Sequence, residues 1–451
     1  MTNSPGVTTR LLRHHDLLAD PSVLNLFYAI GIDGSLDANA LHSAFLSLLQ
    51  YYPILGAAGD DGHDVLAVHD FSGGAAAETE RALAALIATE RKRSHNTHSG
   101  LLVRVTLARL LPAKHLLLLS FHHAAADGWS LALYAAHVSR AYEALLRGVP
   151  IQHPVQPPVS RNVRLEERAE RDRATLRAEL TVLRHEAVDP FGGRRSVEKP
   201  PLRWSSMFDA DFVERLQLLS ASHRVTVFSI VVSAIAQQLQ QMFRLSDLVL
   251  GTIVLGRRSS AEMAEGGASY QGALLVLRGP AFDLGGVGAA VSAAAARVLD
   301  YEEQLSCLST ALGGHRAAEP AVFVLADAHP MSGLRLQDAH LSVVLPSACI
   351  AADPRPAHSP NCGRIALFWR QGTGGASLNV FAEPALAPLA QVLQEGVLRI
   401  LSRWTGAAPK EQAPVPWFGS LVGLSAPIAE AVSPVRLPFE QQAMCNKAAA
   451  P

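Results

Sequence analysis

The chain has 451 residues, of which 49% are apolar and 18% charged, so it can bury large cores and does not have the composition of a disordered protein. The 40 acidic and 39 basic residues leave a formal charge of -1, which excludes a chain-wide basic field for nucleic acid or anionic lipid. The four cysteines lie far apart with no CxxC pair, which excludes a disulfide framework and a zinc ribbon. The longest apolar stretch, 225–239, is interrupted by serine and glutamine, and the N-terminus lacks the apolar segment of a signal peptide. We therefore expect a cytoplasmic enzyme whose partners include neither nucleic acid nor a membrane.

The first 150 residues predict an alternation of strands and helices. The predicted elements are a strand at 26–32, amphipathic helices at 37–49 and 78–90, a hairpin of buried strands at 101–110 and 114–122, and a helix at 129–147. Pro53 follows the first helix, and Gly148 and Pro150 follow the last, where such residues commonly end helices. Residues 1–150 are therefore predicted to form one α/β lobe.

The composition changes between residues 151 and 200. Prolines flank a charge-dense helix at 165–186, which has few apolar residues to bury and carries charges of both signs. We therefore interpret 151–200 as an exposed connector between two lobes, not as a nucleic-acid site.

A second series of strands and helices predicts another α/β lobe over 201–405. Its predicted elements are strands at 204–208, 248–254, 273–278, 364–370 and 377–381, and helices at 211–223, 225–243 and 388–404, with a helix cap near Thr226. Residues 406–451 are rich in proline and lack periodicity, which predicts an irregular tail. Two lobes of similar size suggest that a ligand binds between them.

The string most informative about chemistry is FHHAAADGWS, residues 121–130, at the junction of a predicted strand and a predicted helix. Such a junction places side chains at the end of a sheet, and Gly128 allows a tight backbone where a reactant approaches. A histidine with a pKa near neutrality is well suited to take a proton from a nucleophile, so the pair indicates general-base chemistry. A second pair, His14 and His15, has no third ligand at metal-binding spacing and is interpreted as surface imidazoles.

The segment resembles the HHxxxDGxS motif of the condensation-domain superfamily of nonribosomal peptide synthetases and their stand-alone relatives. Gly34 with Leu36-Asp37, Val225-Thr226, and the run LGTIVLGR at 250–257 resemble further blocks of the same family. The resemblance covers about residues 20–405. It implies an α/β fold of two chloramphenicol-acetyltransferase-like lobes that form a pseudo-dimer, with the active site in the tunnel between them.

Two blocks depart from the family pattern. Where the family has RHExLR the chain has YYPILG at 51–56, and where the family has NTLxLR the chain has ALLVLR at 273–278. These departures favour an acyltransferase with a hydroxyl or unusual amine acceptor over an ordinary peptide-bond-forming module.

The resemblance also assigns roles to residues. These are His123, Asp127 and Gly128 as catalytic residues, His122, Trp129 and Ser130 as substrate-binding residues, and Asp127 with Arg257 as a structural pair. His123 would be the general base, and His122 would mainly support the end of the strand. The Gly128 backbone N–H and the Ser130 hydroxyl are the expected donors to the developing oxyanion.

The implied reaction moves an acyl group from a thioester to an alcohol or amine, which gives an ester or amide in polyketide or nonribosomal peptide biosynthesis. The expected donor is the phosphopantetheine arm of a carrier protein, or CoA, and no metal or bound cofactor is implied. The chain has no GxSxG elbow, which favours direct attack by the acceptor over an acyl-enzyme. The alternative is a non-catalytic docking module that recruits carrier proteins and has no chemical use for His123.

Overall fold

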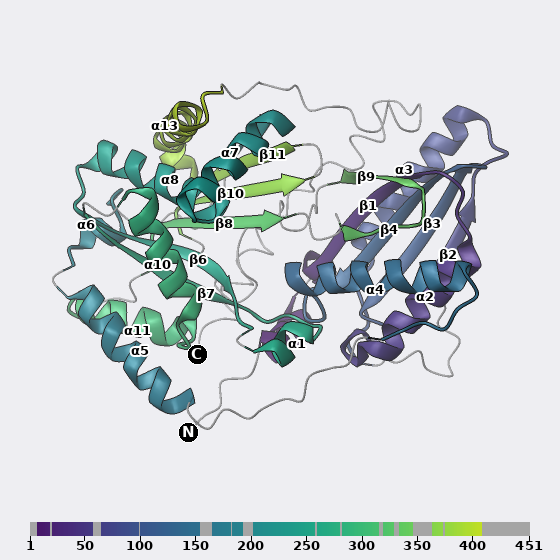
Figure 1. The fold of residues 1–451 in the computed structure, drawn as a ribbon, viewed down its shortest axis with the longest axis horizontal. Coiled ribbons are helices and arrows are strands. Elements are labelled where there is room, and N and C mark those ends of the chain that lie inside the picture. The colour runs from purple at the N-terminus through teal and green to yellow at the C-terminus, as the bar shows by residue number, and fades with distance from the viewer. Residues whose placement is uncertain are drawn as a thin grey trace.

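Two α/β lobes, each built around one sheet, make up the described part of the protein (Figure 1). The computed structural model describes residues 7–407 except 19, 57–64, 99, 154–164, 182, 193–201, 258, 280–281, 315–318, 329–332, 346–362 and 373–374. One sheet has five strands in the order β2-β3-β4-β1-β9, and the other has six in the order β5-β11-β10-β8-β6-β7. The two-lobed α/β class predicted from the sequence is confirmed.

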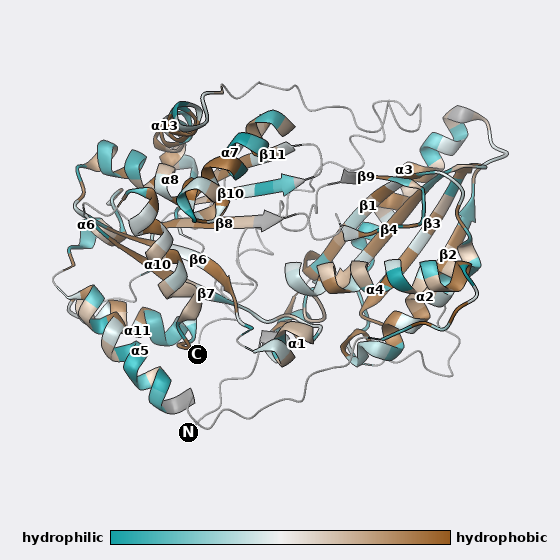
Figure 2. Ribbon diagram, viewed as in Figure 1, coloured by the Kyte–Doolittle hydropathy of each residue, from teal (hydrophilic) through white to brown (hydrophobic). Residues whose placement is uncertain are grey.

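The first lobe follows the predicted order of strands and helices. Its elements are α1 (Val7–Leu17), η1 (Pro21–Leu24), β1 (Asn25–Asp33), α2 (Ala38–Tyr51), η2 (Pro53–Leu55), β2 (Leu66–Asp70), α3 (Ala76–Lys92), β3 (Val103–Leu111), β4 (Lys114–His122) and α4 (Gly128–Leu146). Alternate residues of a strand face opposite sides of a sheet, so Tyr28 and Ile30 pack with the residues of α2 and α4, whereas Phe27 and Ala29 pack with α3. Helices therefore cover both faces of this sheet, whose strands are largely apolar (Figure 2).

One strand of the first sheet comes from the second half of the chain. Strand β9 (His340–Leu345) pairs antiparallel with β1, with Asp33 opposite His340, and lies beside β1 in Figure 1. Leu334 and Leu336, which precede it, join the core of the first lobe. This arrangement differs from the predicted division at residue 201, because pairing with β9 covers backbone groups of β1 that an edge strand would expose.

The second lobe contains the remaining described elements. They are α5 (Leu165–Leu180), α6 (His185–Val188), β5 (Leu202–Phe208), α7 (Ala210–His223), α8 (Val227–Phe243), β6 (Asp247–Leu255), α9 (Ser260–Ala264), β7 (Tyr270–Arg278), α10 (Leu284–Ala296), α11 (Tyr301–Ala311), β8 (Val322–Ala328), β10 (Ile365–Gly372), β11 (Gly375–Ala382), η4 (Pro384–Leu386) and α13 (Ala387–Thr405). Helices α7, α8, α10 and α13 pack on one face of the sheet. Helix α8 begins at the predicted cap, where the Thr226 hydroxyl accepts a hydrogen bond from the Ser229 backbone N–H at 3.1 Å.

Helix α5 is not the exposed connector that the sequence predicts. Leu176 and Leu180 are fully buried against the second lobe, in a cluster with residues of β6, β7 and α11. Glu179 pairs with Arg297 at 2.7 Å, and Asp172 accepts a hydrogen bond from the Val298 backbone N–H at 2.7 Å. The prediction fails because the two leucines lie four residues apart, which is enough to form a narrow apolar stripe on a helix that is otherwise charged.

The described residues contain no single helix long and apolar enough to cross a membrane; helices α7 and α8 meet the length and apolarity criteria only when joined, across a bend of 93°. The predicted proline-rich tail beyond residue 407 lies outside the described residues.

Replacing Leu176 with alanine tests the docking of α5. Because Leu176 is fully buried, we expect the Leu176→Ala variant to lose about 2–5 kcal/mol of unfolding free energy in urea denaturation. The matched control is Arg177→Ala at the next, exposed position of α5, with an expected change below about 0.5 kcal/mol. Equal stabilities of the two variants would contradict the packing of α5 on the second lobe.

Candidate active site

The HHAAADG segment forms the turn between β4 and α4. Strand β4 ends at His122, and α4 begins at Gly128 with Asp127 as its N-cap, so the turn is fixed at both ends. Ala124, Ala125 and Ala126 have 0% exposure, which leaves room only for small side chains in the turn. The position of His123 is therefore set by a buried backbone and not by a mobile loop.

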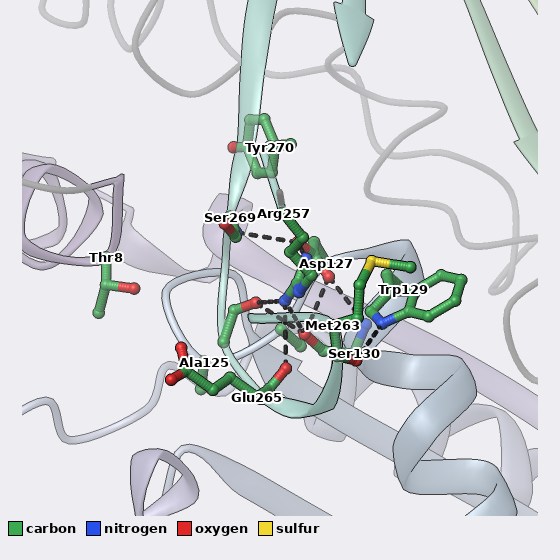
Figure 3. A network of polar contacts seen from close by, with 12 residues as sticks. Thr8, Ala125, Asp127, Trp129, Ser130, Arg257, Met263, Glu265, Ser269 and Tyr270 are labelled. Carbon is green, nitrogen blue, oxygen red and sulfur yellow. Dashed lines mark hydrogen bonds and ion pairs between the residues drawn. The ribbon is translucent and has the colours of Figure 1, made fainter. Parts of the chain in front are cut away.

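The Asp127 carboxylate accepts hydrogen bonds from both halves of the chain (Figure 3). Its Oδ1 accepts from the Ser130 backbone N–H at 2.8 Å and from the Ser130 hydroxyl at 2.9 Å. Its Oδ2 accepts from Arg257 Nη1 at 2.6 Å and from the Ser269 backbone N–H at 2.9 Å. A buried carboxylate must be paired and hydrogen-bonded to offset its loss of hydration, and these four donors do so.

Arg257 follows β6 and enters the first lobe's turn from the second lobe. Its side chain is 1% exposed, and its Nη2 donates to the Ser130 hydroxyl at 2.9 Å and to the Gly267 carbonyl at 2.7 Å. The predicted pair with Asp127 is present. The guanidinium thus joins the start of α4 to the segment that returns from α9 to β7.

That returning segment, 265–269, is also held by backbone hydrogen bonds. The Ala268 backbone N–H donates to the Ala124 carbonyl at 3.3 Å, and the Gly267 backbone N–H donates to the Tyr134 hydroxyl at 3.1 Å. The Tyr134 hydroxyl donates in turn to the Ala125 carbonyl at 2.8 Å. These hydrogen bonds therefore fix the two lobes to each other at the HHAAADG turn.

The hydrogen bonds of His123 define which of its nitrogens can act as a base. Nδ1 lies 3.0 Å from the Ala126 carbonyl oxygen, which can only accept, so Nδ1 carries the proton. In the neutral ring Nε2 then carries the lone pair that can accept a hydrogen bond or a proton. Burial lowers the pKa of His123, which its hydrogen bond to Ala126 and the charge of Asp127 partly oppose. The ring is therefore neutral at pH 7 and ready to accept a proton at Nε2.

Nε2 of His123 faces a residue that the sequence analysis did not select. The Tyr270 hydroxyl lies 3.4 Å from it, and the two ring centroids are 5.1 Å apart. Tyr270 is the first residue of β7, so this contact also crosses between the lobes. A lone tyrosine at the start of a strand has no sequence signature, and only its position in the fold draws attention to it.

His122 is fully buried with both ring nitrogens hydrogen-bonded within the protein, which leaves neither for the predicted contact with substrate, and its partner His15 is buried, not on the surface as predicted. The Ala124 backbone N–H donates to His122 Nδ1 at 3.1 Å, so the neutral His122 carries its proton on Nε2 and donates it to His15 Nδ1, also at 3.1 Å. Burial, followed by the neighbouring His15 and His123, lowers the pKa of His122 to about 3. His15 lies on α1, a helix that the sequence analysis did not predict and that brings this residue against His122 at the end of β4.

The predicted substrate-binding residues Ser130 and Trp129 and the predicted catalytic residue Gly128 differ in their availability. Ser130 is fully buried and its hydroxyl is bonded to Asp127, Arg257 and Gly267, so it cannot also hold an oxyanion as predicted. Trp129 is 37% exposed and donates from Nε1 to the Met263 carbonyl at 2.8 Å. Gly128 is exposed at the first position of α4, where a backbone N–H has no acceptor within the helix. Its role as an oxyanion donor stays a prediction.

Metal ligation has no support in the described part of the chain, where no group of three or more His, Cys, Asp or Glu side chains is placed to hold an ion.

Removing Arg257 tests the importance of the Asp127 pair. We expect the Arg257→Ala variant to lose about 3–5 kcal/mol of unfolding free energy, because the buried Asp127 carboxylate would lose its counter-charge. Urea denaturation measures this loss, and Arg147→Ala serves as the control because Arg147 forms an exposed pair with Glu143, worth about 0–1 kcal/mol. Similar losses in the two variants would contradict a structural role for the buried pair.

The histidine pair predicts a dependence of stability on pH. The folded-state pKa of His122 is about 3, below its ordinary value of 6.5, so the unfolded chain binds a proton that the folded protein excludes. The free energy of unfolding that depends on a neutral His122 is therefore fully present above pH 6.5 and is lost as the pH falls from 6.5 toward 3. Between pH 7.5 and 5.0 we expect wild type to lose about 2 kcal/mol more than His122→Asn, which keeps an acceptor for the Ala124 N–H. Urea denaturation at the two pH values measures both losses, and equal losses of unfolding free energy in wild type and His122→Asn would contradict this account.

Comparison with known proteins places these features in a family. A model of the condensation domain matches residues 8–267. The chain is 30% identical over 182 residues to a linear gramicidin synthase protein of Brevibacillus parabrevis, and the match covers 38% of this chain and 2% of that protein. The chain thus corresponds to a small part of that relative.

Two solved structures share the fold over most of their length. The condensation domain of the monacolin K polyketide synthase MokA has a TM-score of 0.63 at 16% identity, over 90% of this chain and 98% of that one. The starter condensation domain of rhizomide synthetase, solved with C8-CoA and Leu-SNAC, has a TM-score of 0.61 at 16% identity, over 90% of this chain and 94% of that one. Because the family model covers more than half of the 451 residues, including the HHAAADG turn and Arg257, the chain belongs to the condensation-domain family.

Proposed function

We propose that this protein transfers an acyl group from a thioester to a hydroxyl or amine, with His123 as the general base. The observation that carries the proposal is the hydrogen bond from His123 Nδ1 to the Ala126 carbonyl at 3.0 Å. This bond fixes the tautomer and leaves Nε2 as the basic atom, while burial keeps the ring neutral. A docking module would need neither property.

In the proposed step the acceptor's oxygen or nitrogen attacks the thioester carbonyl carbon, and His123 Nε2 takes the proton that the nucleophile loses. The tetrahedral centre then collapses, the carbon–sulfur bond breaks, and the imidazolium returns the proton to the leaving thiolate. Protons and electrons balance without any further reactant. Proton transfer by a positioned side chain contributes about 10²–10⁴-fold to such reactions.

The proposed donor is an acyl thioester on the phosphopantetheine arm of a carrier protein. Membership of the condensation-domain family supports it, and members of this family are parts of synthases such as the linear gramicidin synthase of Brevibacillus parabrevis. An acyl-CoA is the other candidate donor, since the starter condensation domain of rhizomide synthetase was solved with C8-CoA. Both donors present the same thioester and the same arm to His123, and a comparison of loaded carrier with acyl-CoA distinguishes them.

The acceptor is proposed to be either an alcohol or an amine. The departure from the family's NTLxLR block falls on Ala273 and Leu274, which are fully buried in the cores on the two faces of the second sheet. Because these positions pack and do not face His123, their change gives no reason to prefer one class of nucleophile. The product, ester or amide, follows from the acceptor that is consumed.

Replacing His123 tests the proposal. We expect His123→Ala to lower kcat by about 10²–10⁴-fold, because the acceptor would lose its base. The assay follows an acyl-loaded carrier protein by intact-protein mass spectrometry, with a panel of alcohols and amines and with acyl-CoA as the alternative donor. His223→Ala is the matched control, since His223 is exposed at the end of α7.

The outcomes separate the candidate functions. The acyltransferase is supported if the carrier protein loses its acyl mass only when an acceptor and the wild-type protein are present, and not with His123→Ala. Transfer at the wild-type rate by His123→Ala would show that the base is assigned wrongly. Binding of the loaded carrier by wild type without transfer to any acceptor would contradict the proposed reaction and favour the docking module.

A further inference from the structure

We propose that Tyr270 is a second catalytic residue, whose hydroxyl donates a hydrogen bond to the oxyanion that forms on the thioester carbonyl during acyl transfer. The inference rests on the proposed function and adds a residue to it. Its basis is the contact between the Tyr270 hydroxyl and His123 Nε2, at 3.4 Å, in the resting protein.

Packing and the hydrogen bonds of the neighbouring residues fix the position of Tyr270. It is 7% exposed and packs in a cluster with Leu11, Ala124 and Ala268. It follows Ser269, whose backbone N–H donates to Asp127 at 2.9 Å, and it lies opposite Leu255 on β6. In Figure 3 the ring extends from the start of β7, next to the network formed by Asp127 and Arg257. The hydrogen bonds that hold the two lobes together thus also position the tyrosine.

The reaction requires a donor at this place. A nucleophile that gives its proton to Nε2 must lie about 3 Å from that nitrogen. The carbonyl oxygen is bonded to the carbon under attack, so it also comes within a few ångströms of Nε2, where the Tyr270 hydroxyl lies. Ser130, one of the donors expected from the sequence, is committed to Asp127, Arg257 and Gly267. The Tyr270 hydroxyl, by contrast, lies 3.4 Å from His123 Nε2, where the donor is needed.

The hydroxyl has two acceptors in succession. In the resting protein it donates to Nε2 of His123. When the acceptor substrate occupies Nε2, the hydroxyl turns to the thioester carbonyl oxygen, which becomes negatively charged as the new carbon–oxygen or carbon–nitrogen bond forms. On collapse the oxygen recovers its double bond and the thiolate leaves with the proton from His123. Tyr270 keeps its own proton throughout and acts only as a hydrogen-bond donor.

Replacing the hydroxyl alone tests the role. We expect Tyr270→Phe to lower kcat by roughly 10²-fold with little change in KM, because the lost hydrogen bond is made only as charge develops. The ring keeps its packing against Leu11 and Ala124, so the variant should retain the wild-type melting temperature. Tyr142→Phe is the matched control, a buried tyrosine whose hydroxyl accepts from the Asp37 backbone N–H at 3.0 Å in the first lobe.

A second measurement reports the contact without any turnover. A hydroxyl that donates to Nε2 stabilises the neutral imidazole, so its removal should raise the pKa of His123 in an NMR titration of Tyr270→Phe. Tyr142→Phe should leave that pKa unchanged.

A fall in kcat at constant KM together with a raised His123 pKa supports the assignment. The assignment of Tyr270 is overturned, and the role of His123 stands, if wild type is active and Tyr270→Phe keeps the wild-type kcat or changes only KM. An unchanged His123 pKa in Tyr270→Phe would overturn it as well. If wild type transfers no acyl group from either donor, the proposed function fails and the role of Tyr270 with it.

Discussion

The site depends on one buried carboxylate. Asp127 accepts four hydrogen bonds, two from the helix it caps and two from the opposite lobe through Arg257 and Ser269. The Coulomb attraction to Arg257 alone would not offset the desolvation of both charges, so the additional backbone and hydroxyl donors are essential to the pair. The same group thus ends the HHAAADG turn, starts α4 and fixes the position of one lobe against the other.

The proposed chemistry follows from that constraint. With the turn fixed, the Ala126 carbonyl holds the proton on His123 Nδ1, and Nε2 points toward the first residue of β7. The proposed base, His123, comes from the first lobe and the neighbouring hydroxyl of Tyr270 from the second, so neither lobe alone contains the proposed site. Strand β9 strengthens the same dependence, because the first sheet is completed by the second half of the chain. A protein built this way should lose activity whenever the lobes shift, even if each keeps its own core.

The sequence predicts the parts of this arrangement that depend on neighbouring residues. Alternating and helical apolar spacing predicts strands such as β4 and helices such as α8 within a few residues, and the motif predicts the His123 and Asp127 positions. It does not predict contacts between residues far apart in the chain. Tyr270 lies 147 residues from His123, and His15 lies 107 from His122, and neither has a local pattern that would reveal its partner. Ser130 was misassigned for the same reason, since its hydroxyl is taken up by Arg257 and Gly267, which come from the other lobe.

The most direct test of this account is the tautomer of His123 in the resting protein, read from the nitrogen chemical shifts of its imidazole by NMR at neutral pH and assigned by comparison with His123→Ala. The account predicts a neutral ring with the proton on Nδ1 and an unprotonated Nε2, because the Ala126 carbonyl can only accept. A proton on Nε2, or a ring that is charged at neutral pH, would contradict the claim that the interlobe network presents His123 as a base.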